Sequence, residues 1–170
     1  MKTRDFALTA LFIAVVCVAT MVVRIPIPQT NGYMNLGDSM VLLAAVVFGP
    51  WQAFMVGGVG SALADLFGGY PQWALWTLII KGIEALLAGT LLRLLKISSL
   101  RVSVPQILVF ILATAWMVLG YYAAESIMYD SKAALAELPA NVVQASGSVI
   151  LASLLMPVMQ RILGARVSEE

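Results

Sequence analysis

The stretch GYMNLGDSMVLLAAVVFGPW, residues 32–51, decides the fold of this chain. A polar, glycine-containing run ends at Asp38, and an apolar block follows from residue 40 to residue 67. One helix over that block, about 28 residues, would be about 42 Å long, whereas the hydrocarbon core of a bilayer is about 30 Å thick. Proline removes a backbone donor and clashes with the preceding turn, so Gly49-Pro50 predicts two shorter helices joined by a tight turn.

The composition is that of an integral membrane protein. The chain has 170 residues, of which 61% are hydrophobic and 11% charged, and its mean hydropathy is +0.95. Soluble domains use about 45–50% apolar residues and need a charged exterior to stay dispersed. We therefore expect an all-α membrane protein with one domain, residues 1–170. The predicted bundle has six transmembrane helices, at about 5–23, 37–48, 51–67, 73–95, 105–128 and 139–164.

The basic residues predict the orientation of the bundle. Six spans place most of the arginines and lysines on the side of both termini, namely Lys2, Arg4, Arg93, Lys96, Arg101, Arg161 and Arg166. The opposite side keeps only Arg24 and Lys132, and five spans would spoil this separation. The positive-inside rule then predicts that both termini are cytoplasmic. The first apolar segment is too long for a usual signal peptide, and we interpret it as a retained first helix.

Three polar clusters fall on the predicted outer side, in or near the loops 24–38, 66–73 and 129–138. Gathered at one end of a bundle, they would form a pocket for a small molecule that opens outward. The first of these loops contains Pro26, Pro28, Asn31 and Gly32, which favour turns and extended backbone over helix. This loop is either a lid over the pocket or an ordinary connector.

Polar and aromatic residues at these helix ends are the candidate ligand contacts. They are Asn31, Tyr33, Asn35, Asp38, Asp65, Tyr70, Trp73, Trp76, Lys81, Glu84, Tyr121, Glu125, Asn141 and Gln144. Such a mixture of flat rings, amides and carboxylates suits a heteroaromatic solute.

Each kind of candidate has a second interpretation. Asp38 could cap a helix, and the aromatic residues could form an interfacial belt. Lys81 and Glu84, three residues apart within a membrane helix, could pair with each other or contact a ligand.

Several function classes are excluded by what the sequence lacks. The chain has no histidine, only one cysteine (Cys17) and no phosphate-binding Gly-x-x-x-x-Gly-Lys-Ser/Thr motif. We therefore expect no enzyme, no metal site, no cofactor and no nucleic-acid partner. The small residues of the first helix, Ala10 and Ala14, form a small-xxx-small stripe that lets another helix approach closely.

Four motifs resemble the substrate-binding S components of energy-coupling factor (ECF) vitamin transporters. They are residues 32–38, the Phe48-Gly49-Pro50 turn, residues 58–66 and Ile80-Lys81-Gly82. Within that family the chain is similar to the riboflavin-type branch, which includes transporters of hydroxymethylpyrimidine and pyridoxine-like compounds. The resemblance covers essentially the whole chain.

The resemblance implies a multi-pass protein of a prokaryotic plasma membrane that binds a water-soluble vitamin outside. It also implies a membrane T component and two cytoplasmic ATPases as partners. In this family a small-xxx-small motif on the first helix docks to the partner complex, and Ala10 and Ala14 occupy that motif here. The small polar and aromatic residues among the candidate ligand contacts favour a hydroxymethylpyrimidine-like or pyridoxine-like ligand, with riboflavin as the next candidate.

Two other classes remain open at this point. A stand-alone transporter would use Lys81, Glu84 and Asp65 for proton coupling and would need no ATPases. A structural membrane subunit without a ligand would tolerate loss of Asn35, Asp38 and Glu125.

Overall fold

The computed structural model describes residues 3–97 and 102–163. In these residues it contains six α-helices and one antiparallel hairpin of two strands. The elements in chain order are α1 (Thr3–Val22), β1 (Arg24–Ile27), β2 (Gly32–Asn35), α2 (Asp38–Val47), α3 (Pro50–Gly68), α4 (Ala74–Leu94), α5 (Val104–Met128) and α6 (Ser131–Leu163).

The turn at Gly49-Pro50 separates α2 from α3. Gly49 has an extended backbone and precedes Pro50, the first residue of α3, where the missing N–H of proline removes no helical hydrogen bond. At the other end of α3, Gly69 adopts the left-handed conformation with φ 87°, and its N–H bonds to the Asp65 carbonyl. Glycine has no Cβ to oppose this conformation, so the helix ends there without strain.

Two elements differ from the prediction. The first outer loop folds into a hairpin in which Arg24 pairs with Asn35 and Ile27 with Gly32. The last helix begins at Ser131, eight residues before the predicted start at 139, and continues through Pro139. The carboxylate of Asp130 accepts hydrogen bonds at 2.8 Å from the backbone of Lys132 and Ala133, which caps this extension.

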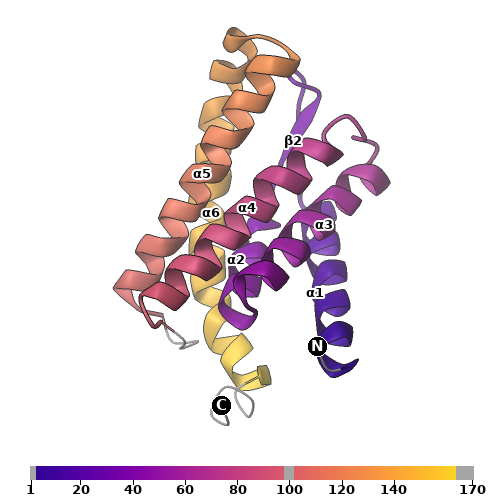
Figure 1. The fold of residues 1–170 in the computed structure, drawn as a ribbon. Helices are drawn as coiled ribbons and strands as arrows, with labels where there is room; N and C mark the ends of the chain where they lie inside the picture. Colours follow the sequence, from indigo (N-terminus) through magenta and orange to yellow (C-terminus); the bar gives the residue numbers. More distant parts are fainter. Residues whose placement is uncertain (1–2, 98–101, 164–170) are drawn as a thin grey trace.

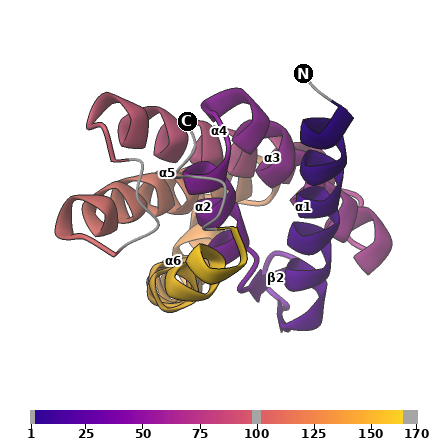
Figure 2. The same cartoon turned by 90° about the horizontal axis from the view of Figure 1, so that it is seen from below.

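The helices gather around the short α2. Figure 1 shows α5 and α6 side by side at one edge and α1 at the other, with α2, α3 and α4 between them. The view from below shows the same separation, with α1 packed beside α3 and distant from α5 (Figure 2). The β-hairpin, the α3–α4 connection and the α5–α6 connection lie at the upper end in Figure 1.

Small residues allow α3 to pack closely on both sides. A Cβ added at Gly60 would lie 2.8 Å from the Ile13 carbonyl of α1, and one at Gly58 would lie 2.7 Å from the Leu78 carbonyl of α4. These glycines therefore serve helix packing, as expected for association in lipid.

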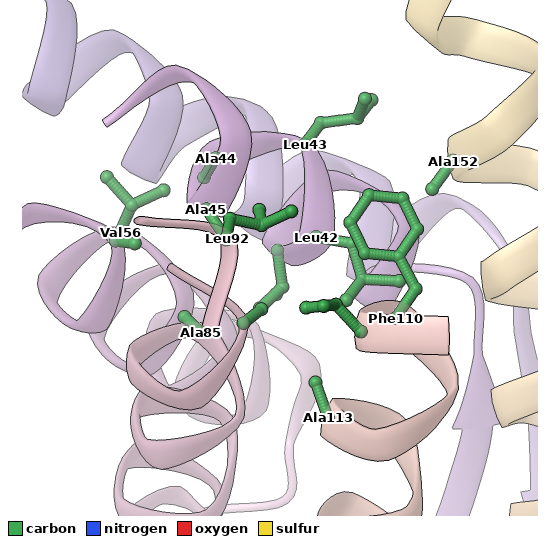
Figure 3. Close-up of a cluster of buried hydrophobic side chains, with 14 of the residues drawn as sticks. Leu42, Leu43, Ala44, Ala45, Val56, Ala85, Leu92, Phe110, Ala113 and Ala152 are labelled. Carbon is green, nitrogen blue, oxygen red and sulfur yellow. The ribbon is translucent and has the colours of Figure 1, made fainter. Parts of the chain in front are cut away.

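The principal core lies where the six helices meet. Leu42 and Leu43 of α2 pack with Leu92 of α4, Phe110 of α5 and Ala152 of α6, and all five are buried (Figure 3). The inner half of α2, from Val41 to Ala45, is wholly in this core. Its outer end, by contrast, begins with the buried polar residues Asp38 and Ser39.

Four helices of the described part of the chain, α1, α4, α5 and α6, are long and apolar enough to cross a membrane. The ten-residue α2 is apolar but shorter. Large apolar side chains such as Leu119 of α5 and Leu154 of α6 are exposed on the bundle surface, as they would be against lipid.

Candidate functional site

A cavity, here called the central cavity, lies between the hairpin and the outer ends of the helices. Residues from α1, α3, α4, α5, α6 and β2 line it, so segments far apart in the sequence converge there. The lining residues are Thr20, Gly32, Tyr33, Asn35, Ser61, Asp65, Trp73, Thr77, Lys81, Tyr121, Glu137, Asn141 and Gln144.

A buried ion pair lies at the cavity wall. The Lys81 ammonium donates to Asp38 Oδ1, and the side chains of both residues are almost completely buried. Gln144 Nε2 donates to the other oxygen, Asp38 Oδ2, at 2.8 Å. Asp38 is therefore held by α4 and α6, and each of its two oxygens accepts from one of these helices.

Of the two interpretations of Lys81 and Glu84, the structure does not show their mutual ion pair, because Lys81 pairs with Asp38 on another helix. Glu84 is fully buried one turn from Lys81 and lies close enough to Asp38 and Lys81 to interact electrostatically with both. It does not line the central cavity. Burying two carboxylates and one ammonium within a membrane is costly unless the three side chains are well paired with one another.

The hairpin closes the cavity from the outer side. Thr30, in the turn between the strands, donates to the Glu137 carboxylate of α6. The backbone N–H of Asn35 donates to Gln144 Oε1 at 2.7 Å, and the Asn31 carbonyl accepts from the indole of Trp73 at 3.2 Å. Since these bonds reach α4 and α6, the hairpin is attached to the helices that form the cavity.

Aromatic residues form much of the remaining wall. Trp73 is only 4% exposed, and its ring centroid lies 6.0 Å from that of Tyr121. The Tyr121 hydroxyl is 3.0 Å from the Thr77 hydroxyl, and the Lys81 ammonium lies 5.4 Å from the centre of the Tyr121 ring. Flat walls with polar edges suit a flat ring that carries polar groups.

Tyr33 connects the hairpin to α3. Its hydroxyl donates to Asp65 Oδ1 at 2.5 Å, and its ring packs on Tyr70 at a centroid separation of 4.6 Å. Burial and the negative charge of Asp65 raise the pKa of Tyr33 above its ordinary value. Tyr33 therefore remains a protonated donor over the physiological pH range.

The predicted ligand contacts fall into two groups. Those that line the central cavity are Tyr33, Asn35, Asp65, Trp73, Lys81, Tyr121, Asn141 and Gln144. The others lie around it. Asn31 and Tyr70 line a second, more open pocket on the outer side of the hairpin. Asp38 and Glu125 support the wall through Lys81 and Asn141, Glu84 is buried behind it, and Trp76 packs in an apolar cluster with Trp73.

The sequence did not single out several lining residues, namely Thr20, Ser61, Thr77 and Glu137. Thr20 and Ser61 lie on helices whose sequences indicate lipid contact or helix packing. A single hydroxyl in such a helix does not by itself predict a binding site. Glu137 could have been found, because it is one turn from Asn141 once the helix starts at Ser131 rather than at 139.

Some buried polar atoms at the cavity have no hydrogen-bond partner of good geometry among the described residues. They include Thr20 Oγ1 and Asp65 Oδ2, although the Thr77 hydroxyl lies close to Asp65. Glu125 uses Oε1 to accept from Asn141 at 3.0 Å and leaves Oε2 without a partner. Buried polar groups are usually satisfied, so unsatisfied ones around a cavity mark places where a ligand can bond.

The chemistry of the site is that of binding. Among the described residues no group of three or more His, Cys, Asp or Glu side chains could hold a metal ion. The cavity offers carboxylates, hydroxyls, amides and aromatic faces, and none of its hydroxyls has a histidine to activate it, because the chain contains none.

Comparison with known proteins identifies the family. A family model described as the S component of an ECF-type riboflavin transporter matches residues 1–161. An uncharacterized protein from Pyrococcus woesei is 42% identical over 150 residues, which cover 88% of this chain and 97% of that protein. The thiamine precursor transporter HmpT of Lactococcus lactis is 31% identical over 159 residues, covering 93% of this chain and 89% of HmpT.

A solved structure of the S component of a bacterial ECF transporter has the same fold. It superposes with a TM-score of 0.63 at 20% sequence identity and covers 97% of this chain and 98% of that one. The fold, the family match and the polar cavity agree, and the chain belongs to the family of S components of ECF-type riboflavin transporters.

Proposed function

We propose that this chain binds a hydroxymethylpyrimidine-like thiamine precursor in the central cavity and delivers it inward as part of an ECF transporter. The observation that carries the proposal is the polar cavity with aromatic walls in a chain of this family. The similarity to HmpT along nearly the whole chain favours a thiamine precursor over riboflavin. The ligand-contacting residues are then those that line the cavity, supported by Asp38, Glu84 and Glu125.

The membrane arrangement in this proposal has six spans and cytoplasmic termini. The four long apolar helices support it, and α2 and α3 together supply two further, shorter crossings between the outer hairpin and the α3–α4 connection. The turn between α2 and α3 lies against Arg93, a basic residue of the predicted cytoplasmic side.

The partners in this proposal are a membrane T component and two cytoplasmic ATPases. Ala10 and Ala14 are exposed on α1, next to the exposed Leu11 and Val18, so the small-residue stripe faces away from the bundle. An outward stripe of small residues supports close approach of a helix from another chain.

Uptake of labelled hydroxymethylpyrimidine tests the proposal in cells that express the chain with a T component and both ATPases. We expect uptake that requires ATPase activity and that is lost in Ala14→Trp, whereas Ala14→Trp retains ligand binding when purified. A matched control is Leu119→Trp, an exposed α5 position outside the stripe.

A stand-alone proton-coupled transporter is the second candidate, favoured by the buried Asp38, Lys81 and Glu84 group. It predicts uptake that persists without the ATPases and collapses with the proton gradient. That result would overturn the ATPase-dependent mechanism and leave ligand binding by the cavity in place.

A further inference from the structure

More acidic than basic side chains lie at the central cavity. Five carboxylates lie in or directly behind its wall, from α2, α3, α4, α5 and α6, and they are Asp38, Asp65, Glu84, Glu125 and Glu137. Only one cation, Lys81, is among the lining residues. All five carboxylates and Lys81 are at most 4% exposed, so solvent screens their charges weakly.

The positive charge of Lys81 is already matched. Its ammonium is bonded to Asp38, whose second oxygen accepts from Gln144, and this pair is buried. An anionic ligand would have to compete with Asp38 for Lys81 and would leave a buried carboxylate without its cation. Breaking a buried pair in this way is strongly unfavourable.

Arg24 is the other cation near the site, but its guanidinium is directed elsewhere. It donates to the Gly68 carbonyl at 3.2 Å and to the Met21 carbonyl at 3.1 Å, and its carbon lies 5.8 Å from the centre of the Tyr33 ring. Arg24 does not line the central cavity. Its positive charge acts on Asp65 from outside the cavity.

The acceptors of the cavity are available, by contrast. Asp65 is 2% exposed, with one oxygen bonded to Tyr33 and Oδ2 without a partner of good geometry. Glu137 accepts from Thr30 through Oε2, and Oε1 is its second acceptor. Ionised carboxylates only accept hydrogen bonds, so they require a ligand that donates.

We propose that the central cavity selects its ligand by charge: it binds a neutral or protonated heteroaromatic ring whose amino or ring N–H donates to Asp65, and it rejects the phosphate ester of the same compound. This inference rests on the proposed function, since it assigns the form of the vitamin precursor that the transporter accepts. The aromatic faces of Trp73 and Tyr121 bind the ring, and Asp65 and Glu137 set the charge preference.

Calorimetric titration with matched pairs tests the inference. The pairs are hydroxymethylpyrimidine, pyridoxine and riboflavin, each with its own phosphate ester. For the pair that contains the ligand, the free compound should bind at least about 100-fold more tightly than its ester, as expected when a like charge is brought against buried carboxylates.

Two isosteric variants locate the selection. Asp65→Asn should weaken binding of the free compound about tenfold or more. In this variant an amide N–H₂ group takes the place of Oδ2, so a donor of the protein would face the N–H donor of the ligand. Glu137→Gln should reduce the preference for the free compound over its phosphate ester, because it removes one acidic group from the cavity wall. If Asp65→Asn does not fold, Glu137→Gln tests the charge selection in its place. Asp130→Asn is the matched control, since that exposed carboxylate caps α6 outside the cavity, and both affinities should stay unchanged.

The outcomes separate this inference from the proposed function. Equal binding of hydroxymethylpyrimidine and its ester would overturn the charge selection and leave the function standing. Selective binding of free pyridoxine or free riboflavin instead would overturn the proposed substrate and support the charge selection. If no free compound binds, both fail.

Discussion

Two buried parts of α2 are chemically opposite. At the inner end, Val41 to Ala45 pack with Leu92 and Phe110, and the buried surface is apolar throughout. At the outer end, Asp38 is just as buried but has Lys81 and Gln144 as partners, and unsatisfied acceptors lie nearby. The first region stabilises the bundle by packing alone, whereas the second keeps costly polar groups at the place where a solute can use them.

The largest effect should come from breaking the buried ion pair. Lys81→Met removes the cation and leaves Asp38 buried without its partner, which should lower the free energy of unfolding by about 3–5 kcal/mol. Thermal unfolding in detergent followed by circular dichroism measures the loss. The double variant Lys81→Met with Asp38→Asn should recover part of it, and an unchanged midpoint in the single variant would refute the pair as a structural element.

A substitution in the apolar region should affect stability without affecting ligand affinity. Phe110→Ala removes a fully buried ring from the core in Figure 3 and should cost about 3–5 kcal/mol of stability. Calorimetry on the fraction that remains folded should give the wild-type dissociation constant. A large loss of affinity there would show that the two regions are not separable.

Two buried hydroxyls have no hydrogen-bond partner in the part of the chain that the structure describes. Thr20→Val removes a hydroxyl that lines the cavity, and Ser148→Ala removes one that does not. Neither should reduce stability, because an unsatisfied buried polar atom is replaced by an apolar one. Thr20→Val should weaken ligand binding by about 1 kcal/mol, roughly fivefold, and Ser148→Ala should leave binding unchanged. Equal affinities of the two variants would remove Thr20 from the ligand contacts.

The smallest effect concerns Tyr33 and alkaline pH. Its pKa is raised by folding, so the unfolded chain loses this proton first, and wild-type stability should fall as the pH rises above about 10. Tyr33→Phe should cost about 1 kcal/mol at pH 7, through the lost bond to Asp65, and should show a shallower fall above pH 10. Parallel slopes for the two proteins would contradict this assignment.

The sequence predicted the elements that depend on local chemistry. Gly49-Pro50 separates α2 from α3 because proline interrupts a helix. The helices α4 and α5 were predicted because each coincides with one long apolar block. The start of α6 was missed because the predicted apolar block begins only at residue 139, whereas the Asp130 cap lies nine residues earlier. The hairpin was missed because four-residue strands with prolines give a weak signal.

The candidate site was predictable only in part, for a related reason. Polar residues at helix ends are visible in the sequence, and many of them converge on the cavity. Their partners depend on how helices pack, so Lys81 paired with Asp38 on α2 rather than with Glu84 on its own helix. Thr20 and Ser61 enter the wall only because α1 and α3 approach closely at Gly60.

Calorimetric titration of the purified wild-type chain with hydroxymethylpyrimidine is the most direct test of the central claim. We expect one binding site per chain with a submicromolar dissociation constant, because this subunit would capture a scarce solute in a preformed cavity. The absence of binding heat at millimolar ligand, with protein that unfolds cooperatively, would contradict it.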